Sequence, residues 1–200
     1  MTPAIEVAGA GRAYGDRVVL RDLSFTVQEG TMLAVLGPNG SGKTTLLRML
    51  ATLLRPHAGS VRVLDAEVPR DGWRVRGRLG LLAHEPLLYR DLTARENLTF
   101  HARLHGVARS RVDELLERVG MSLRADEPLR LLSRGMTQRI AVCRAVLHEP
   151  ELLLLDEPYA NLDPVAEALV RDVLRAPTQV LVSHDHEAAR AEADDVLRLT

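Results

Sequence analysis

The chain carries Gly37-Pro38-Asn39-Gly40-Ser41-Gly42-Lys43-Thr44-Thr45, and this stretch decides its fold. The spacing G-x-x-x-x-G-K-T is that of a loop that wraps the phosphates of a nucleoside triphosphate. Its glycines let the backbone turn tightly enough for N–H groups to face the phosphates. Lys43 is placed to reach the β- and γ-phosphates, and the Thr44 hydroxyl can coordinate Mg²⁺. We therefore predict that all nine residues bind the nucleotide.

The sequence on either side of this loop supports the prediction. Met32–Leu36, before the loop, is an apolar run of strand length, and leucines recur behind the loop at helical spacing. A strand, a glycine loop and a helix in this order point a helix N-terminus at phosphate. Lys43 is also the only lysine among 26 basic residues, so arginine replaces lysine everywhere except where a compact ammonium must reach phosphate.

Polar residues that suit a nucleotide site also end two later apolar runs. Leu152–Leu155 is continuously apolar, as strands buried in a parallel sheet are, and it is followed by Asp156 and Glu157. Ligands of open α/β sheets bind at the carboxyl ends of such strands. We expect Asp156 to hold Mg²⁺ through water and Glu157 to orient or deprotonate the attacking water. The run 179–183 delivers His184 to a strand end, where it can bond the γ-phosphate.

The N-terminal part of the chain contains two apparent strands, Ile5–Ala8 and Arg17–Val27, joined by an expected loop at 9–15. Tyr14 is the aromatic residue of that loop. Its ring could stack on a nucleobase, since stacking tolerates any aromatic face, or it could be a packed loop residue. The local sequence leaves both interpretations open.

From Thr93 to Gly120 the apolar pattern becomes helical, with Ser110 and Asp113 as an expected capping pair. The segments before and after this region read as strands. A mainly helical insert at about 85–148 is therefore predicted between two strand-rich parts of the chain.

Four residues that could carry chemistry are given structural roles instead. His101 and His105 lie four apart on a predicted helix, and an exposed polar face is favoured over a metal site because no third ligand is near in sequence. Cys143 stands in an apolar stretch and is expected to be buried rather than reactive. Trp73 is expected to be partly buried at the surface.

Length and composition limit the class of protein. Two hundred residues suffice for one domain with a subdomain, and 46% hydrophobic with 26% charged residues is usual for a soluble globular protein. A net charge of −1 provides no field that attracts nucleic acid, so no nucleic-acid partner is predicted. The longest apolar stretches have four or five residues, whereas a bilayer span needs about 20. Any membrane-spanning part is expected to be another polypeptide.

Taken in order, these motifs resemble the ATP-binding-cassette (ABC) family over essentially the whole chain. Tyr14 resembles the adenine-stacking aromatic of the family, and residues 37–45 resemble its Walker A loop. Asp156 and Glu157 correspond to the Walker B aspartate and the catalytic glutamate. Asn161-Leu162-Asp163 corresponds to the D-loop, and His184 corresponds to the switch histidine. The resemblance implies ATP and Mg²⁺ as ligands. It also implies an α/β P-loop NTPase fold at 1–200, with a mostly parallel RecA-like core, a small N-terminal antiparallel β subdomain and an α-helical subdomain.

The signature of the family, usually Leu-Ser-Gly-Gly-Gln, is found here as Leu132-Ser133-Arg134-Gly135-Met136. Ser133 would cap the following helix, so that its hydroxyl, the backbone N–H groups and the helix dipole converge on an anion. In the family that anion is the γ-phosphate held by the second cassette of a head-to-tail dimer, so the resemblance implies a homodimer. The predicted catalytic residues are Lys43, Ser133, Gly135, Glu157 and His184.

His84 replaces the glutamine of the family's Q-loop; it is a poorer ligand for Mg²⁺, but we include it with Thr44 and Asp156 among the candidate metal-binding residues. The residues around it, 83–106, and the signature are similar to the ATP-binding subunit of the haem exporter used in c-type cytochrome maturation. We therefore expect an ATPase at the cytoplasmic face of the cell membrane that drives integral-membrane transporter subunits. The alternatives are an exporter of drug, lipid or peptide, a soluble ABC ATPase without a transport role, and a regulatory nucleotide binder.

Overall fold

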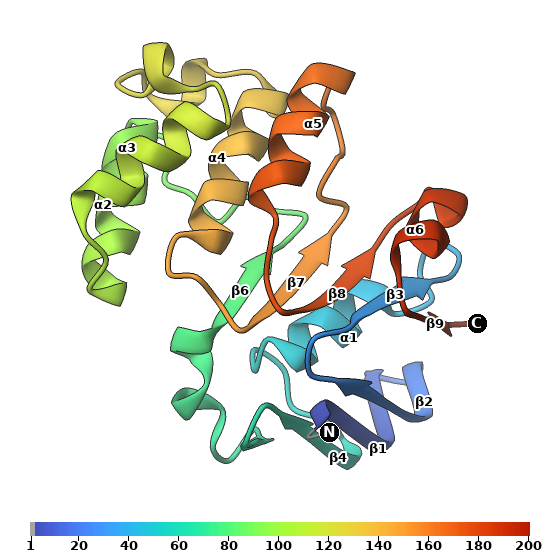
Figure 1. Cartoon of the computed structure of the whole chain (residues 1–200). Coiled ribbons are helices and arrows are strands. Elements are labelled where there is room, and N and C mark those ends of the chain that lie inside the picture. Colours follow the sequence, from blue (N-terminus) through green and yellow to red (C-terminus); the bar gives the residue numbers. More distant parts are fainter. Residues whose placement is uncertain (1–2) are drawn as a thin grey trace. The chain divides into compact units, whose positions relative to one another are not determined.

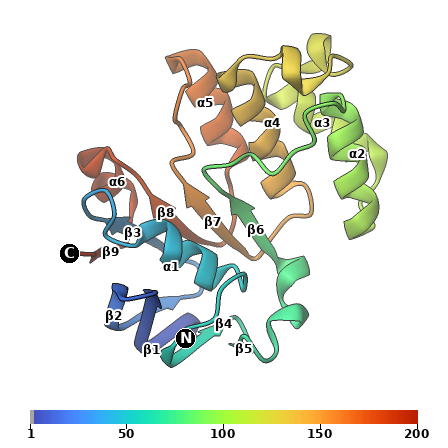
Figure 2. The ribbon, with the colours of Figure 1, turned by 180° about the vertical axis from the view of Figure 1, so that it is seen from behind.

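The computed structural model describes residues 3–200, so the cassette predicted at 1–200 begins two residues before the described part. Within that part the chain forms two compact units (Figure 1 and Figure 2). The sheet unit comprises the residues up to 81 together with 151–157 and 177–200, and the helical unit comprises 82–150 and 158–176. The helical insert predicted at 85–148 falls within the helical unit, which also takes in 158–176.

The main sheet of the described chain has five strands in the order β6-β7-β8-β3-β9. Its strands are β3 (Met32–Leu36), β6 (Leu79–Leu82), β7 (Leu152–Asp156), β8 (Thr178–Val182) and β9 (Asp195–Arg198). β8 pairs in parallel with β7 and with β3, and β3 pairs in parallel with β9. β7 is buried along its whole length, as an uninterrupted apolar run predicts for a parallel strand covered on both faces. The parallel core expected from the sequence is confirmed.

A second sheet of four antiparallel strands, in the order β2-β1-β4-β5, is formed by residues 3–68. Its strands are β1 (Pro3–Tyr14), β2 (Arg17–Gln28), β4 (Ala58–Val63) and β5 (Ala66–Val68). The N-terminal antiparallel subdomain is therefore confirmed, although the loop predicted at 9–15 is wrong. β1 runs on to Tyr14, which pairs with Arg17. Pairing with β2 supplies the hydrogen bonds that hold this segment extended, and the glycines mark bulges instead.

The core of the sheet unit is shared by both sheets and by α1 (Lys43–Leu50). Ile5 and Val63 come from the antiparallel sheet, Val35 and Leu154 from the parallel sheet, and Leu46 from α1. A short helix, α6 (His186–Glu192), precedes β9. Because α1 and the ends of the strands belong to one packed core, the loop before α1 is held at the carboxyl end of β3 in the parallel sheet.

The helical unit contains α2 (Ala94–His105), α3 (Arg109–Arg118), α4 (Arg134–Val146) and α5 (Pro164–Val173), and its short 3₁₀ turns are η3 (Ser122–Arg124) and η4 (Leu129–Leu131). The sheet unit has the 3₁₀ turns η1 (Gly72–Arg74) and η2 (Arg76–Arg78). Asp163 caps α5, since its carboxylate accepts the Ala166 N–H at 2.9 Å. Figure 1 shows α4 and α5 lying side by side, α4 being the helix that follows the signature.

The helical pattern predicted from Thr93 to Gly120 is interrupted, because the chain adopts a left-handed conformation at Gly106 between α2 and α3. The predicted Ser110 cap is wrong: α3 begins at Arg109, behind Ala108, with no side-chain cap. A capping box forms instead at the start of α2, where Thr93 and Glu96 satisfy each other's backbone N–H groups. Both sites carry a hydroxyl three residues before an acid. They differ only in whether the folded chain starts its helix directly after the hydroxyl residue.

Two of the structural roles assigned from the sequence have clear outcomes here. Cys143 is fully buried, and burial raises the pKa of its thiol to about 12, so the residue is inert as predicted. Trp73, expected to be partly buried, is 71% exposed on η1, so that prediction is wrong. None of the helices in residues 3–200 combines the length and the apolar character needed to cross a bilayer.

Candidate nucleotide-binding site

The phosphate loop leads from β3 into α1, and its geometry depends on Gly42. Gly42 adopts φ +98°, and a Cβ there would lie 2.7 Å from Leu20 Cδ2 and 3.0 Å from the Val19 carbonyl oxygen. Gly42 is the N-cap of α1, which has no side-chain cap and no acidic residue in its first turn. The first N–H groups of α1 are thus left for a ligand, and the helix dipole favours an anionic one.

The side chain of Lys43 is buried within the phosphate loop. Its ammonium donates to the carbonyl oxygens of Gly37 at 2.7 Å and Pro38 at 2.9 Å, and the residue is only 7% exposed. These two contacts hold the positive charge across the loop. A triphosphate bound there would meet a cation that is already in place, which reduces the cost of ordering a long side chain.

Thr44 and Asp156 bring a hydroxyl and a carboxylate together from α1 and β7. Thr44 Oγ1 donates to Asp156 Oδ2 at 3.0 Å, and Asp156 is 5% exposed at the carboxyl end of its strand. Hard oxygen donors of this kind suit Mg²⁺, which prefers one or two protein ligands completed by water and phosphate oxygens. The residues at this position therefore fit the predicted ion.

Glu157 and His184 form the other polar pair of the site. Glu157 Oε1 lies 2.5 Å from His184 Nε2, so the two side chains hold each other. The chain turns sharply after β7, because Glu157 has φ +52°, and its N–H donates to the Val182 carbonyl at 2.9 Å. A left-handed conformation is costly for a residue with a side chain, and such strain is typical of sites where geometry serves chemistry.

These groups surround a cavity of about 270 Å³ in the sheet unit. Its lining residues are Val19, Asn39, Gly40, Gly42, Lys43, Thr44, Thr45, Asp156, Glu157 and His184. Six of the nine residues of the phosphate loop are among them; Gly37, Pro38 and Ser41 are not. The structure thus gathers the predicted cation, two of the three candidate metal-binding residues (Thr44 and Asp156), the water-orienting acid and His184 in one place, although some of them are more than 100 residues apart in the sequence.

Tyr14 lies outside that lining, at the end of β1, and is 46% exposed. One face of its ring is covered by Arg12, whose guanidinium carbon lies 5.0 Å from the ring centroid. This arrangement leaves an aromatic surface available, which suits a stacked base better than a packed loop residue. The assignment of Tyr14 to the base remains a prediction.

The signature belongs to the helical unit, where Ser133 caps α4 as predicted. Ser133 Oγ accepts the Met136 N–H at 3.2 Å. Gly135 is pressed against the D-loop, since a Cβ at this residue would lie 2.6 Å from the Asn161 carbonyl oxygen. Gln138, one turn further, donates to the Pro158 carbonyl at 3.1 Å. The start of α4 and the D-loop are therefore fastened together, a link that sequence reasoning missed.

His84 also belongs to the helical unit, so its predicted metal role stays a prediction. The residue is exposed and lines a cavity of about 450 Å³. Arg90, Arg130 and Arg134 line the same cavity, and the residues lining it include no acid. The replacement of the Q-loop glutamine thus comes with a markedly cationic surrounding.

A histidine cluster in the helical unit was only partly foreseen. The ring of His105 stacks on that of His148, which follows α4, with centroids 4.1 Å apart. The prediction that His101 lies on an exposed face is wrong: its Nε2 is buried without a hydrogen-bond partner, and burial, with Arg144 and the two other histidines, lowers its pKa to about 4. Among residues 3–200 no group of three or more His, Cys, Asp or Glu side chains could hold a metal ion.

The fold and the site together define a P-loop nucleotide-binding cassette. Residues 20–160 match the family model described as "ABC transporter", and the chain belongs to this family. Among solved structures it is similar to "Structure of ATP binding subunit of ABC transporter", with 26% identity, a TM-score of 0.88 and coverage of 98% of this chain and 85% of that one. The cassette MJ0796, solved as a dimer with ADP and phosphate, has the same fold: 24% identity, a TM-score of 0.88, and coverage of 98% and 94%.

Curated relatives are similar over almost the whole of this chain. The daunorubicin resistance ATP-binding protein DrrA3 of Streptomyces coeruleorubidus is 41% identical over 98% of the chain. The Nod factor export ATP-binding protein I of Ralstonia nicotianae is 37% identical over 98%. The chain spans 66% and 64% of the length of these two relatives. Both are named for resistance or export rather than for haem export, which the resemblance of 83–106 had suggested.

Proposed function

We propose that this chain is the ATP-hydrolysing subunit of an ABC exporter and works as a dimer with a membrane-spanning partner. The observation that carries the proposal is the single cavity at which Lys43, the Thr44–Asp156 pair and the Glu157–His184 pair meet. A regulatory nucleotide binder would not need the second pair. A soluble ABC ATPase without a transport role has no support from the relatives, which are named for resistance and export.

The chemistry follows from where these groups lie. Lys43 and the open N-terminus of α1 bind the phosphates and neutralise the charge that develops on them. Mg²⁺, held beside Thr44 and Asp156, supplies further neutralisation of phosphate charge when bound. Glu157 accepts a hydrogen bond from the attacking water and orients it, while His184 holds the carboxylate in place at 2.5 Å. Positioning and charge stabilisation account for most of the catalysis in such transfers.

A second copy of the chain completes the site in this proposal. Ser133 and the N-terminus of α4 present a hydroxyl and a positive helix end, and Gly135 keeps the first turn free of a side chain. In the family these groups face the γ-phosphate of the opposite cassette. Binding of ATP would then close the dimer, and hydrolysis would open it.

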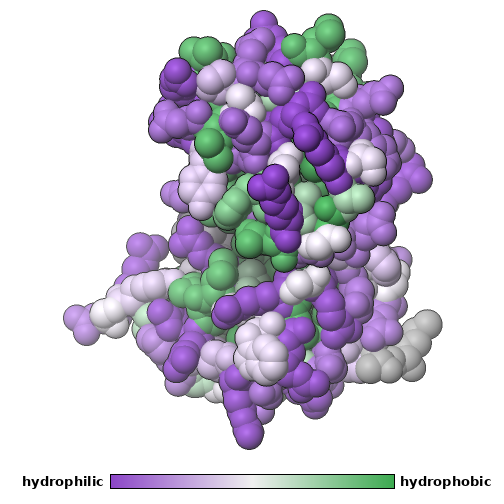
Figure 3. All heavy atoms as spheres, turned by 90° about the vertical axis from the view of Figure 1, so that its left-hand side faces the viewer, coloured by the Kyte–Doolittle hydropathy of each residue, from purple (hydrophilic) through white to green (hydrophobic). Residues whose placement is uncertain are grey.

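The helical unit offers a surface for the membrane partner at α2 and the segment before it. Leu87, Tyr89, Phe100 and Leu104 are exposed, and the rings of Tyr89 and Phe100 meet edge to face at 5.6 Å. Figure 3 looks onto the side of the molecule on which α2 lies and shows apolar groups standing among polar ones.

That surface has a rigid base, because the fully buried Asn97 fixes the segment before α2. Asn97 Oδ1 accepts the Tyr89 N–H at 2.8 Å, and its Nδ2 donates to the carbonyl oxygens of Tyr89 and Thr93 at 3.0 and 2.9 Å. An ordered segment is suited to transmit movement to a partner, since little entropy is lost on docking. The cytoplasmic face of the membrane is the proposed location.

The proposed cargo is a drug or another small molecule of the kind that the names of the relatives give. Daunorubicin resistance and Nod factor export both appear among them. Haem export for c-type cytochrome maturation is a second candidate, favoured by the sequence around His84 and by the signature.

The Glu157→Gln variant tests the ATPase proposal. We expect the purified wild-type chain to hydrolyse Mg·ATP, and the variant to bind ATP but turn it over about 100 to 1,000 times more slowly. We also expect the variant, but not Lys43→Ala, to form an ATP-dependent dimer in size-exclusion chromatography. Turnover at the wild-type rate in Glu157→Gln would remove Glu157 from its role.

Deletion of the gene separates the two cargoes. Increased sensitivity to daunorubicin, restored by the wild-type gene but not by Lys43→Ala, would support the drug exporter. Loss of covalently bound haem from membrane c-type cytochromes, with unchanged drug sensitivity, would support haem export instead.

A further inference from the structure

A cluster of groups behind Tyr14 has no role in the mechanism above. Arg12 lies two residues before Tyr14 on β1, and its guanidinium carbon stands 5.0 Å from the centre of the Tyr14 ring. This distance is within the range of a cation–π contact, in which the face of the ring attracts the cation. Arg12 thus covers one face of a ring that is otherwise half exposed.

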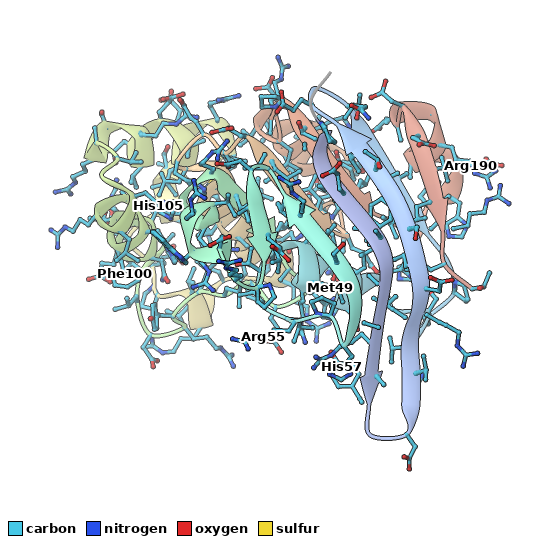
Figure 4. The ribbon with its side chains drawn as sticks, turned by 90° about the horizontal axis from the view of Figure 1, so that it is seen from below. Met49, Arg55, His57, Phe100, His105 and Arg190 are labelled. Atoms are coloured by element: carbon cyan, nitrogen blue, oxygen red, sulfur yellow. The ribbon has the colours of Figure 1, made fainter. Side chains whose placement is uncertain are left out.

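The guanidinium is held in that position by the segment between α1 and β4. Arg12 Nη1 donates to the Arg55 carbonyl oxygen at 2.8 Å and lies 2.8 Å from His57 Nε2, which must accept because a guanidinium can only donate. The segment is itself tied to β1, since the His57 N–H donates to the Gly11 carbonyl at 2.8 Å. Figure 4 shows Arg55 and His57 beside the far end of the β1–β2 hairpin.

We propose that Arg12 is a positioning residue that fixes the ring of Tyr14 for stacking on the nucleobase, with Arg55 and His57 holding the guanidinium. The inference rests on the proposed stacking of the base on Tyr14. A ring with a cation on one face presents the other face to the base. Because the ring is held before the nucleotide arrives, less side-chain entropy is lost on binding.

The competing explanation is that Arg12 only fastens the 55–57 segment to the hairpin. Nη1 makes two contacts with that segment, whereas Nε is buried and has no hydrogen-bond partner. A fastener would serve the folded state whether or not a base is present. Inorganic tripolyphosphate separates the two explanations, because it can occupy the phosphate loop but has no base to stack.

The experiment measures the dissociation constants of ATP and of inorganic tripolyphosphate by calorimetry on the full chain. Arg12→Met, which keeps the length but not the charge, should weaken ATP binding about fivefold and leave tripolyphosphate within about twofold. Arg12→Lys should fall between wild type and Arg12→Met. His57→Ala should weaken ATP binding about twofold, since it removes one of two anchors. Arg62→Met, on β4 of the same sheet, is the matched control.

The double variant Tyr14→Ala/Arg12→Met gives the decisive comparison. If Arg12 acts through the ring, adding Arg12→Met to Tyr14→Ala changes ATP binding no further. An equal loss of affinity for ATP and tripolyphosphate in both Arg12→Met and Arg12→Lys would overturn the inference and make Arg12 a fastener. If Tyr14→Ala itself leaves ATP binding unchanged, the proposed base stacking fails, and this inference fails with it.

Discussion

The two helices proposed to face phosphate, α1 in the sheet unit and α4 in the helical unit, begin in opposite ways. α1 starts at Gly42 with no side-chain cap, whereas the first turn of α4 is capped by Ser133, whose Oγ accepts the Met136 N–H. An uncapped start leaves N–H groups unsatisfied until a ligand arrives, while a capped start is stable alone. This difference suits the proposal that α1 holds the nucleotide of its own chain and that α4 meets the nucleotide of a second chain.

The largest expected effect is a difference in ATP affinity between a variant at the start of α1 and a variant at the start of α4. Lys43→Ala should weaken ATP binding by the isolated cassette about 100-fold, because it removes a buried charge that the phosphates would pair with. Ser133→Ala should change the affinity of the same isolated cassette less than twofold. Titration of each variant with a fluorescent ATP analogue, at concentrations where the chain is monomeric, measures both. Equal losses in the two variants would break the comparison.

Replacing the glycine at each helix start is expected to lower the unfolding free energy by different amounts. Gly42→Ala should cost about 3 kcal/mol of unfolding free energy, because φ is +98° and the new Cβ would meet Leu20 and the Val19 carbonyl. Gly135→Ala should cost about 1 to 2 kcal/mol, because the residue has no left-handed strain and the Asn161 carbonyl of the D-loop can shift.

Denaturant unfolding measures both costs. Gly77→Ala, where a Cβ would have open space, is the control and should be close to neutral. A Gly135 variant as unstable as the Gly42 variant would show that the D-loop cannot yield.

Acid should affect the helical unit through His101. Burial and the charge of Arg144 lower the pKa of His101 from 6.5 to about 4, with His105 and His148 adding to the effect. The unfolded chain therefore binds the proton more tightly than the folded chain, so stability is full above pH 6.5 and falls as the pH drops from 6.5 to 4. We expect a loss of about 2 kcal/mol, reduced by solvent screening, in wild type but not in His101→Leu. Urea unfolding at a series of pH values measures the unfolding free energy. If this free energy falls between pH 6.5 and 4 as steeply in His101→Leu as in wild type, the prediction is contradicted.

The smallest effect concerns the caps themselves. Ser133→Ala should lower the unfolding free energy by about 1 kcal/mol, the usual value of an N-cap, and Ser133→Thr should restore most of it. Ser110→Ala in α3 is the matched control and should be neutral, because that helix has no side-chain cap. A loss at Ser110 equal to that at Ser133 would mean that the sequence-predicted cap forms after all.

Much of the fold could be predicted from the sequence because its signals are local. The phosphate loop, the apolar run of β7 and the Ser133 cap each depend on neighbouring residues, and all three have the predicted structure. Predictions failed where a distant segment decided the outcome. β1 continues past Gly9 because β2 pairs with it, and His101 is half-buried, with Arg144 of α4 and His148 close to it.

By itself, the sequence determined that a helix would follow the phosphate loop, that acids would end a buried strand at Asp156 and that a histidine would end the run 179–183 at position 184. Spacing along a strand or a helix is sufficient for such statements. Only the tertiary structure decided that Thr44 meets Asp156, that Glu157 meets His184 and that Arg12 backs Tyr14. The first two contacts join residues that are 112 and 27 positions apart. Arg12 and Tyr14 are neighbours on β1, but Arg55 and His57, more than 40 residues further along the chain, hold the Arg12 guanidinium, and no local pattern of residue types encodes such contacts.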